Sequence, residues 1–304
     1  MRLGCAAFWS FSPTSATLKG RTTCSTQEQA ETLSLHLWLL YNGCIHRQRP
    51  GRMRYETLLY RKAEAVRLIS INRPEADNAI NMRLAEELAD VCADVNRDEM
   101  ARVVIITGVG EKAFSVGADL KEFSLQIAKP PSVAAPVASL TIPVIVAING
   151  DALGQGLELA LACDLRIAVE TARFALNHVA LGFIPWDGAT QRLPRLVGRA
   201  KAMEMLLTGQ HIDATEAYHI GLIHRVVSRE ELMPLVMDMA QAIAAKALFA
   251  VKYAKEAICK GLDLTLEQGL RLEADLYCLL HTTEDRTEGI RAFLEKRPPK
   301  FQGK

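Results

Sequence analysis

One carboxylate, Glu158, follows a glycine-rich turn in the middle of the chain, within the segment NGDALGQGLELALACDLR at residues 149–166. Gly154 and Gly156 have no Cβ, so a ligand can approach the backbone of this turn closely. The turn leads into a predicted helix of small and apolar residues, and the free N–H groups at a helix N-terminus favour negative charge. The pattern therefore predicts a site for a developing oxyanion.

Glu158 itself has the surroundings of a base. It is the only ionisable side chain between Ala152 and Ala162, and its neighbours are leucine and alanine. Removal from water favours the uncharged carboxyl, whereas a place in the first helical turn favours the charged form by only about 0.3–1 kcal/mol. The alternative is that Glu158 only complements the helix dipole and the glycines only permit tight packing. This stretch alone does not decide between the two.

A second loop could supply another oxyanion donor. A β-branched run at residues 102–107 predicts a buried strand, and the loop at 111–122 after it contains Gly117 and Ala118, whose small size exposes backbone N–H groups. The alternative is a plain turn in which Asp119 caps a following helix. Three prolines within residues 123–142 exclude a long regular helix there.

The remaining pattern predicts a mixture of strands and helices. We expect strands at 55–60 and 66–71, joined by a charged turn at 61–64, and further strands at 143–148, 165–169, 173–176 and 223–227. We expect helices at 82–95, 199–207, 230–246, 248–260, 264–281 and 284–296. Strands first and a helical tail afterwards indicate α/β or α+β packing with a terminal helical subdomain.

Composition excludes several classes of protein. The 304 residues are 49% hydrophobic and 23% charged, with a formal net charge of +1, which gives no support for an extended nucleic-acid surface. No apolar run approaches the roughly 18 residues that span a bilayer, so we expect no membrane segment. The seven cysteines form no CxxC pair and no metal-ligand spacing. They are typical of free thiols in a reducing compartment, with no metal site.

Residues 1–52 differ from the rest of the chain. They contain three of the seven cysteines and two of the three tryptophans, and their six Arg or Lys against two Glu give them a charge of +4. Because the first 27 residues contain no acidic residue, this segment could be a transit peptide, which would place the protein in the mitochondrial matrix. We favour a disordered extension outside the fold, with Met53 as the working start and a cytoplasmic location, because no amphipathic, Arg-rich helix is present.

Five stretches, taken in order, resemble the enoyl-CoA hydratase/isomerase, or crotonase, family. They are RPEADNAI at 73–80, AFSVGADLKE at 113–122, PVIVAINGDALGQGLELALACD at 143–164, IPWDGATQRL at 184–193 and AFLEKR at 292–297. The resemblance runs from about Met53 to the C-terminus. It implies an α/β fold, with a spiral of ββα turns at 53–245 that carries the active site and a helical trimerisation subdomain at 246–304. It also implies a homotrimer or a dimer of trimers, an acyl-CoA thioester as substrate, and no separate cofactor.

The resemblance places an oxyanion hole on two backbone N–H groups. These belong to Ala118 and Gln155, and the residues that contact coenzyme A would be Ala118, Asp119, Leu120, Lys121 and Gln155. Two N–H groups that polarise the thioester carbonyl would stabilise an enolate, with an effect of about 10² to 10³ in rate for each donor. Gln155 stands where the family usually has glycine or alanine. Its N–H remains, but its side chain must point away from the substrate.

The two acid/base positions of the family fall on Glu158 and His178. Glu158 matches the first of two catalytic glutamates, whereas His178, within NHVALG at 177–182, replaces the second. An imidazole can transfer a proton near neutral pH, so we expect His178 to be catalytic beside Glu158; the alternative is a histidine that only fills the position. Trp186 and Asp187 also replace small residues, which would narrow the acyl pocket or add a polar contact.

Rival functions fit the residues less well. A dinucleotide dehydrogenase needs a third glycine that residues 154–159 lack, and the GxSxG motif of serine hydrolases is absent. Isomerisation ranks below hydration, because it usually depends on the carboxylate that His178 replaces. Decarboxylation, C–C cleavage and thioester hydrolysis share the oxyanion hole and stay open. RNA binding, without a basic and aromatic cluster, and a noncatalytic role are the last alternatives. Among these functions, the resemblance implies an enoyl-CoA hydratase, a hydro-lyase of fatty acid metabolism.

Overall fold

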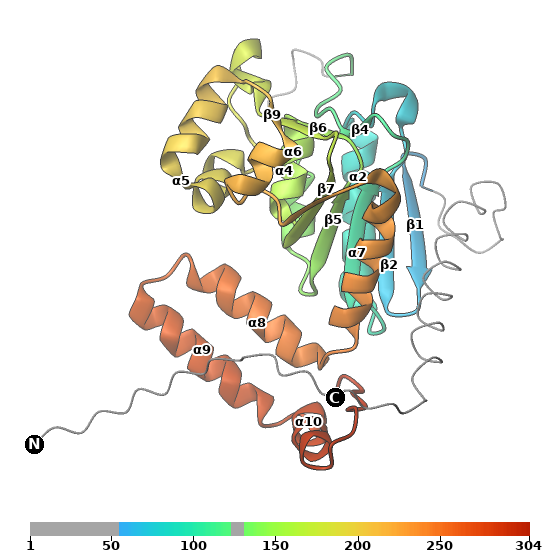
Figure 1. Cartoon of the computed structure of the whole chain (residues 1–304), viewed down its shortest axis with the longest axis vertical. Coiled ribbons are helices and arrows are strands. Elements are labelled where there is room, and N and C mark those ends of the chain that lie inside the picture. The colour runs from blue at the N-terminus through green and yellow to red at the C-terminus, as the bar shows by residue number, and fades with distance from the viewer. Residues whose placement is uncertain (1–54, 123–130) are drawn as a thin grey trace, which may run out of the picture. The chain divides into compact units, whose positions relative to one another are not determined.

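Two β-sheets form the framework of the computed structural model (Figure 1), which describes residues 55–122 and 131–304; the predicted extension at 1–52 lies outside these residues. The larger sheet has the order β1 (Leu58–Ala63), β2 (Val66–Ile71), β3 (Val103–Gly108), β5 (Val144–Ile148), β7 (Leu165–Val169), β10 (Arg225–Val227). Its β1–β2 pair is antiparallel and the other pairs are parallel. Every residue of β3 and β5 is buried, because both faces of these strands are covered. Such strands appear in a sequence as unbroken apolar runs.

The smaller sheet is made of strands of two or three residues. Its order is β4 (Ala113–Ser115), β6 (Asp151–Leu153), β8 (Arg173–Ala175), β9 (Ile212–Asp213). The chain alternates between the sheets: β3 is followed by β4 and α3 (Ala134–Ala138), and β5 by β6 and α4 (Gln155–Ala162). The strands β7 and β8 and the short 3-10 helix η2 (Asn177–Leu181) repeat this order. The expected α/β spiral of ββα turns is therefore confirmed.

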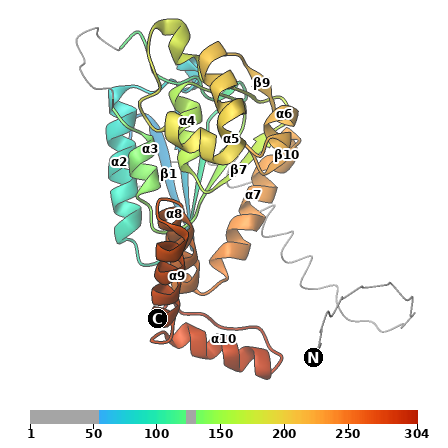
Figure 2. The same ribbon diagram turned by 90° about the vertical axis from the view of Figure 1, so that its left-hand side faces the viewer.

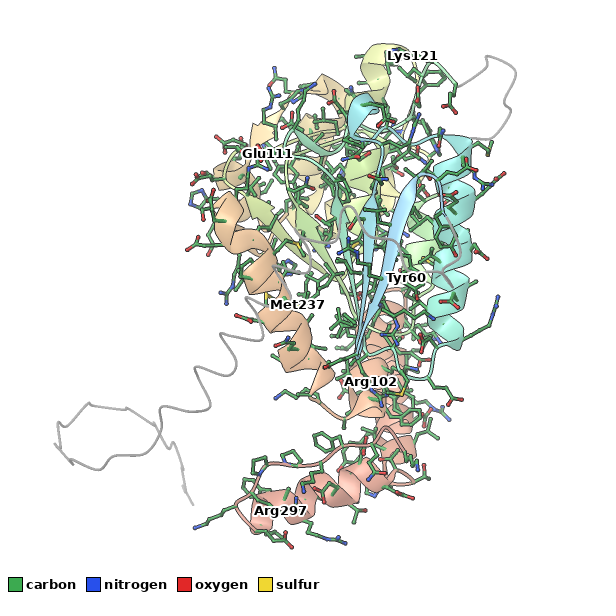
Figure 3. The ribbon with its side chains drawn as sticks, turned by 90° about the vertical axis from the view of Figure 1, so that its right-hand side faces the viewer. Tyr60, Arg102, Glu111, Lys121, Met237 and Arg297 are labelled. Carbon is green, nitrogen blue, oxygen red and sulfur yellow. The ribbon has the colours of Figure 1, made fainter. Side chains whose placement is uncertain are left out.

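Helices cover the strands on both sides, as Figures 2 and 3 show for α2 (Met82–Arg97) and α7 (Arg229–Ala244). The predicted apolar stripe of α2, which includes Leu84 and Leu88, is buried, and the Asn81 side chain caps the helix by accepting the Leu84 N–H at 3.0 Å. Helix α7 packs on β2, β3, β5 and β7. The 3-10 turn η1 (Pro74–Ala76) and the short helix α6 (Ala214–His219) complete this part of the chain.

The C-terminal helical tail consists of α8 (Leu248–Gly261), α9 (Leu266–Leu280) and α10 (Glu284–Leu294). Helices α8 and α9 pack against each other, and Figure 1 shows all three in orange to red. Lys255 on α8 joins this tail to the sheet region, because its Nζ donates to the Ile142 carbonyl at 2.9 Å and to Asp164 Oδ2 at 2.7 Å. Most of the large apolar side chains on these helices are exposed.

The structure corrects several predicted boundaries. Strand β1 begins at Leu58, so the predicted turn at 61–64 is mostly strand; the turn lies at Glu64 and Ala65, where the pairing of Ala63 with Val66 closes the hairpin. The helix predicted at 199–207 is the second part of α5 (Ala189–Thr208), whose two helical stretches meet at Gly198, with φ of 78°. The strands β4, β6 and β9 were not predicted, because two or three residues show no periodicity.

The described part of the chain contains no single helix that is long and apolar enough to cross a membrane; α7 and α8 meet that requirement only as a pair bent by 106°. Four cysteines are described and all are free, with Cys92 and Cys163 buried and Cys259 and Cys278 exposed. This agrees with the predicted free thiols, while the other three cysteines lie outside the described residues.

Candidate active site

Glu158 lies one turn into α4 and its side chain is completely buried. Its Oε1 accepts two backbone hydrogen bonds, from the Asp187 N–H at 2.9 Å just before α5 and from the Ala189 N–H at 3.0 Å, at the first residue of α5. Its Oε2 has no hydrogen-bond donor among the described residues. The carboxylate is therefore fixed in position through one oxygen, and the other oxygen is left for a ligand.

His178, on η2, faces that open oxygen. Its Nε2 is 3.4 Å from Glu158 Oε2, and only 5% of its surface is exposed. The Trp186 ring meets the imidazole edge-on, with the ring centres 5.2 Å apart. The His178 Nδ1 is buried and has no hydrogen-bond partner in the described chain. Because buried polar atoms that serve packing alone are normally hydrogen-bonded, these open atoms on both residues fit a pair that receives a ligand.

Two backbone segments meet at the start of α4. Gly117 has φ of +93°, and a Cβ there would lie 2.8 Å from the Leu153 carbonyl oxygen and 3.0 Å from the Gln155 nitrogen. Only glycine can therefore lie so close to the turn before α4. Within the described residues, neither the Ala118 N–H nor the Gln155 N–H donates to another group of the chain. The structure thus brings both predicted oxyanion donors into one region and leaves them open.

The same turn also contacts His178. Gly154 has φ of +51°, and a Cβ there would lie 3.9 Å from His178 Cε1 and 3.3 Å from Asn177 Oδ1. Three segments, the loop at Gly117, the turn at Gly154 and the helix η2, therefore surround the N-terminus of α4. This arrangement can polarise a carbonyl with two N–H groups while a carboxylate and an imidazole act on atoms nearby.

The Gln155 side chain is completely buried and turned toward another part of the chain. Its Nε2 donates to the Pro131 carbonyl at 2.7 Å and to Asp187 Oδ2 at 3.2 Å. From the sequence, Asp187 was expected either to narrow the acyl pocket or to add a polar contact. The structure shows a polar contact, with the Gln155 amide. The many contacts of Asp187 with residues 132–134 were not foreseen. The only signal was an acidic residue in an otherwise apolar turn.

The predicted coenzyme A strip begins at Ala118 and continues to Lys121. Asp119 accepts a hydrogen bond from Arg73 NH2 at 2.9 Å and from the Lys121 N–H at 3.2 Å, so its carboxylate serves an ion pair and a turn. No described helix begins at Asp119, so the helix-cap interpretation finds no support among the described residues. Leu120 and Lys121 are exposed, and Figure 3 shows Lys121 at one end of the molecule.

The described residues provide no metal site, and the two buried cysteines are not reactive. No group of three or more His, Cys, Asp or Glu side chains among them is arranged to hold a metal ion. Cys163, at the end of α4, is not a nucleophile, because burial and the nearby Asp164 carboxylate raise the pKa of its thiol far above the usual value. Burial likewise raises the pKa of the Cys92 thiol to about 12.

Comparison with known proteins gives one consistent result. A family model described as enoyl-CoA hydratase/isomerase matches residues 61–304. A crotonyl-CoA hydratase of Syntrophomonas wolfei is 41% identical over 263 residues, which cover 83% of this chain and 100% of that protein. A short-chain-enoyl-CoA hydratase of Clostridium acetobutylicum is 38% identical over 253 residues, which cover 81% and 97%. The crystal structure of an enoyl-CoA hydratase from Bacillus anthracis superposes with a TM-score of 0.80 at 41% identity, covering 82% of this chain and 100% of that one.

Proposed function

Because this chain belongs to the enoyl-CoA hydratase/isomerase family, we propose that it is an enoyl-CoA hydratase, a hydro-lyase that adds water across the 2,3-double bond of an acyl-CoA thioester. The observation that carries the proposal is the buried Glu158, whose one open oxygen faces His178 beside two unused backbone N–H groups. The names of the relatives from Syntrophomonas wolfei and Clostridium acetobutylicum support hydration of short enoyl chains.

The N–H groups of Ala118 and Gln155 bind the thioester oxygen. They withdraw electrons from the conjugated C2–C3 double bond, and C3 becomes open to attack by water. The enolate that forms places its negative charge on the same oxygen, where the two donors and the N-terminus of α4 stabilise it. Since these donors are backbone groups fixed by the packing at Gly117, they need no rearrangement when the charge develops.

Glu158 and His178 divide the proton transfers. Glu158 Oε2 takes a proton from the water as its oxygen bonds to C3, and the imidazolium form of His178 donates a proton to C2, so that the enolate collapses to the 3-hydroxyacyl thioester. The carboxylate is then protonated and the imidazole neutral. Because Oε2 and Nε2 lie 3.4 Å apart, the proton can pass back and restore the pair. No group besides water and the thioester is consumed, so the proposal needs no separate cofactor.

The assembly and location belong to the same proposal. The C-terminal segment that contains α8, α9 and α10 exposes a set of large apolar side chains, which are Ile258, Leu262, Leu264, Leu266, Leu270, Tyr277, Leu279, Ile290, Phe293 and Leu294. A set of this size typically marks a protein interface, and we assign it to further copies of this chain, in a trimer or a dimer of trimers with residues 246–304 as the trimerisation subdomain. The strip at 118–121 is proposed to bind coenzyme A. A role in fatty acid metabolism and a cytoplasmic location complete the proposal, with the mitochondrial matrix as the location if residues 1–52 are a transit peptide.

The direct experiment is a panel of enoyl-CoA thioesters, beginning with crotonyl-CoA, in which hydration is followed by loss of the conjugated enoyl absorbance. We expect turnover that the variant Glu158→Gln loses while it still binds the thioester, seen as an upward shift of its melting temperature. If the protein decarboxylates a thioester, cleaves a C–C bond or releases free coenzyme A but hydrates no enoyl thioester, that reaction takes the place of hydration as its activity. Tight RNA binding without a thermal shift from any thioester would contradict the proposal.

A further inference from the structure

Asp187 is a buried carboxylate that the mechanism above does not use. Its oxygens accept the Val133 N–H at 2.7 Å, the Ala134 N–H at 3.0 Å, the Gln155 amide at 3.2 Å and the Ser132 hydroxyl. Its own backbone N–H donates to Glu158 Oε1 at 2.9 Å. One residue outside the reacting groups is therefore bonded to both residues at the start of α4 on which the reaction depends.

The contact with Gln155 determines where that side chain lies. The Gln155 amide uses its two N–H groups on two acceptors, the Pro131 carbonyl and Asp187 Oδ2. Rotating the amide by 180° would place its oxygen against both acceptors, so only the observed orientation is favourable. The buried amide oxygen has no partner among the described residues, so Asp187 and Pro131 alone hold the amide group through hydrogen bonds.

We propose that Asp187 is a positioning residue: it holds the Gln155 side chain away from the space in front of the Gln155 N–H and so keeps that donor open to the thioester oxygen. A glutamine side chain is long and flexible. Without hydrogen bonds to its two acceptors, a side chain of this length can move over the neighbouring backbone and block the approach of the substrate. The inference rests on the proposed function, because it assigns a purpose to the Gln155 N–H.

The first test compares two variants of Gln155. In Gln155→Met the side chain keeps its length but loses both hydrogen bonds, whereas in Gln155→Ala no side chain is left to position. The inference predicts that kcat/KM for crotonyl-CoA is about 10-fold lower in Gln155→Met than in Gln155→Ala, part of the 10² to 10³ that one oxyanion donor contributes. The melting temperature should follow the opposite order, because methionine fills the buried space better. If activity follows the melting temperature, the side chain only serves packing and the inference is wrong.

The second test asks whether Asp187 acts through Gln155. Asp187→Ala, which removes the acceptor of the Gln155 amide, should lower kcat/KM by about 10-fold or more in the natural chain, but by less than about 3-fold when measured against Gln155→Ala as the background. The matched control is Ser132→Ala, which removes a different partner of Asp187 and should change kcat/KM by less than about 3-fold. Equal losses in both backgrounds, or a loss in Ser132→Ala equal to that in Asp187→Ala, would show that Asp187 acts through residues 132–134. If Asp187→Ala does not fold, the two Gln155 variants still decide the question.

An infrared measurement separates this inference from the hydratase proposal. Butyryl-CoA has no double bond to hydrate, yet its carbonyl stretching frequency falls when an oxyanion hole polarises it. We expect this shift in the natural protein and in Ser132→Ala, and a smaller shift in Asp187→Ala and Gln155→Met. A natural protein that shifts the carbonyl frequency but hydrates no enoyl thioester would refute the hydratase and leave the inference standing. Variants that keep the full shift would overturn the inference.

Discussion

Two glutamates of this protein, Glu87 on α2 and Glu158 on α4, are both buried carboxylates, but their oxygens are used differently. Glu87 accepts three hydrogen bonds, from the Glu56 N–H at 2.8 Å on Oε1 and from the Thr57 N–H at 2.9 Å and hydroxyl at 2.6 Å on Oε2. Its Oε1 also forms an ion pair with Arg83, whose Nε lies 2.9 Å away. Glu158 accepts two hydrogen bonds, both on Oε1, and leaves Oε2 open.

The difference separates a structural carboxylate from a chemical one. At Glu87 every donor stabilises the charged form and nothing is left to react. Although burial alone would raise the pKa of Glu87, the hydrogen bonds from Glu56 and Thr57 and the charge of Arg83 hold it below its usual value. At Glu158 the two N–H groups fix the carboxylate, while the free oxygen faces His178. Burial alone therefore does not identify an active carboxylate; an unused oxygen does.

The largest effect should come from Glu158→Gln. The amide oxygen can keep both N–H bonds of Oε1, and the amide nitrogen takes the place of the open Oε2, so the protein should melt at an unchanged or higher temperature. Because a neutral amide cannot accept a proton from water, kcat should fall by about 10² to 10⁴. Steady-state kinetics and calorimetry on the same sample measure both. A large loss of melting temperature would show that the two oxygens of Glu158 are not used as described.

Replacement of His178 should have the next largest effect. His178→Ala removes the proton donor opposite Glu158, and we expect kcat to fall by about 10². His178→Glu places a second carboxylate at this position, as the family pattern has, and should retain or raise activity. Unchanged kinetics in the Ala variant would mean that the imidazole only fills space and that Glu158 works alone.

Glu87→Gln should have the opposite consequences to Glu158→Gln. An amide has only one acceptor oxygen, so either the Glu56 N–H or the two Thr57 donors lose their acceptor. The free energy of unfolding should therefore fall by about 1–3 kcal/mol. For a chain of this size we expect a lower melting temperature by a few degrees, about 2–4 °C per kcal/mol. Hydratase activity should stay within about 2-fold of the natural chain, well below the loss from removing one general acid or base. A drop in kcat at an unchanged melting temperature would contradict the structural role of Glu87.

The smallest expected effect is the change, at acidic pH, in how much Glu87 contributes to the stability of the protein. Because the folded pKa of Glu87 is below its usual value of 4.5, its contribution to stability is complete above that value and is lost as the pH falls through the folded pKa. The difference in unfolding free energy between the natural chain and Glu87→Gln should therefore narrow below about pH 4.5. Urea unfolding at a series of pH values measures it. A difference that stays constant down to pH 3 would mean that Glu87 is not stabilised in its charged form.

Part of the fold could be predicted because the signals are local. The unbroken apolar runs that became β3 and β5, and the apolar stripe of α2, depend only on the burial that the sheet and helix require. The short strands β4, β6 and β9 could not be predicted in this way. They exist because the spiral brings them beside one another, and nothing in two or three residues specifies a partner.

The candidate site likewise has one part that could be predicted from the sequence and another part that could not. By itself, the sequence determined that a glycine-rich turn leads into an apolar helix bearing Glu158, since both features lie within a few neighbouring residues. Only the tertiary structure decided which Glu158 oxygen is open, and that the loop at Gly117 lies on the Gln155 nitrogen. It also placed Asp187 where its carboxylate accepts a hydrogen bond from the Val133 N–H, 54 residues away along the chain. The reason is physical: hydrogen bonds and close backbone contacts depend on distances that the folded chain sets, and sequence separation does not encode them.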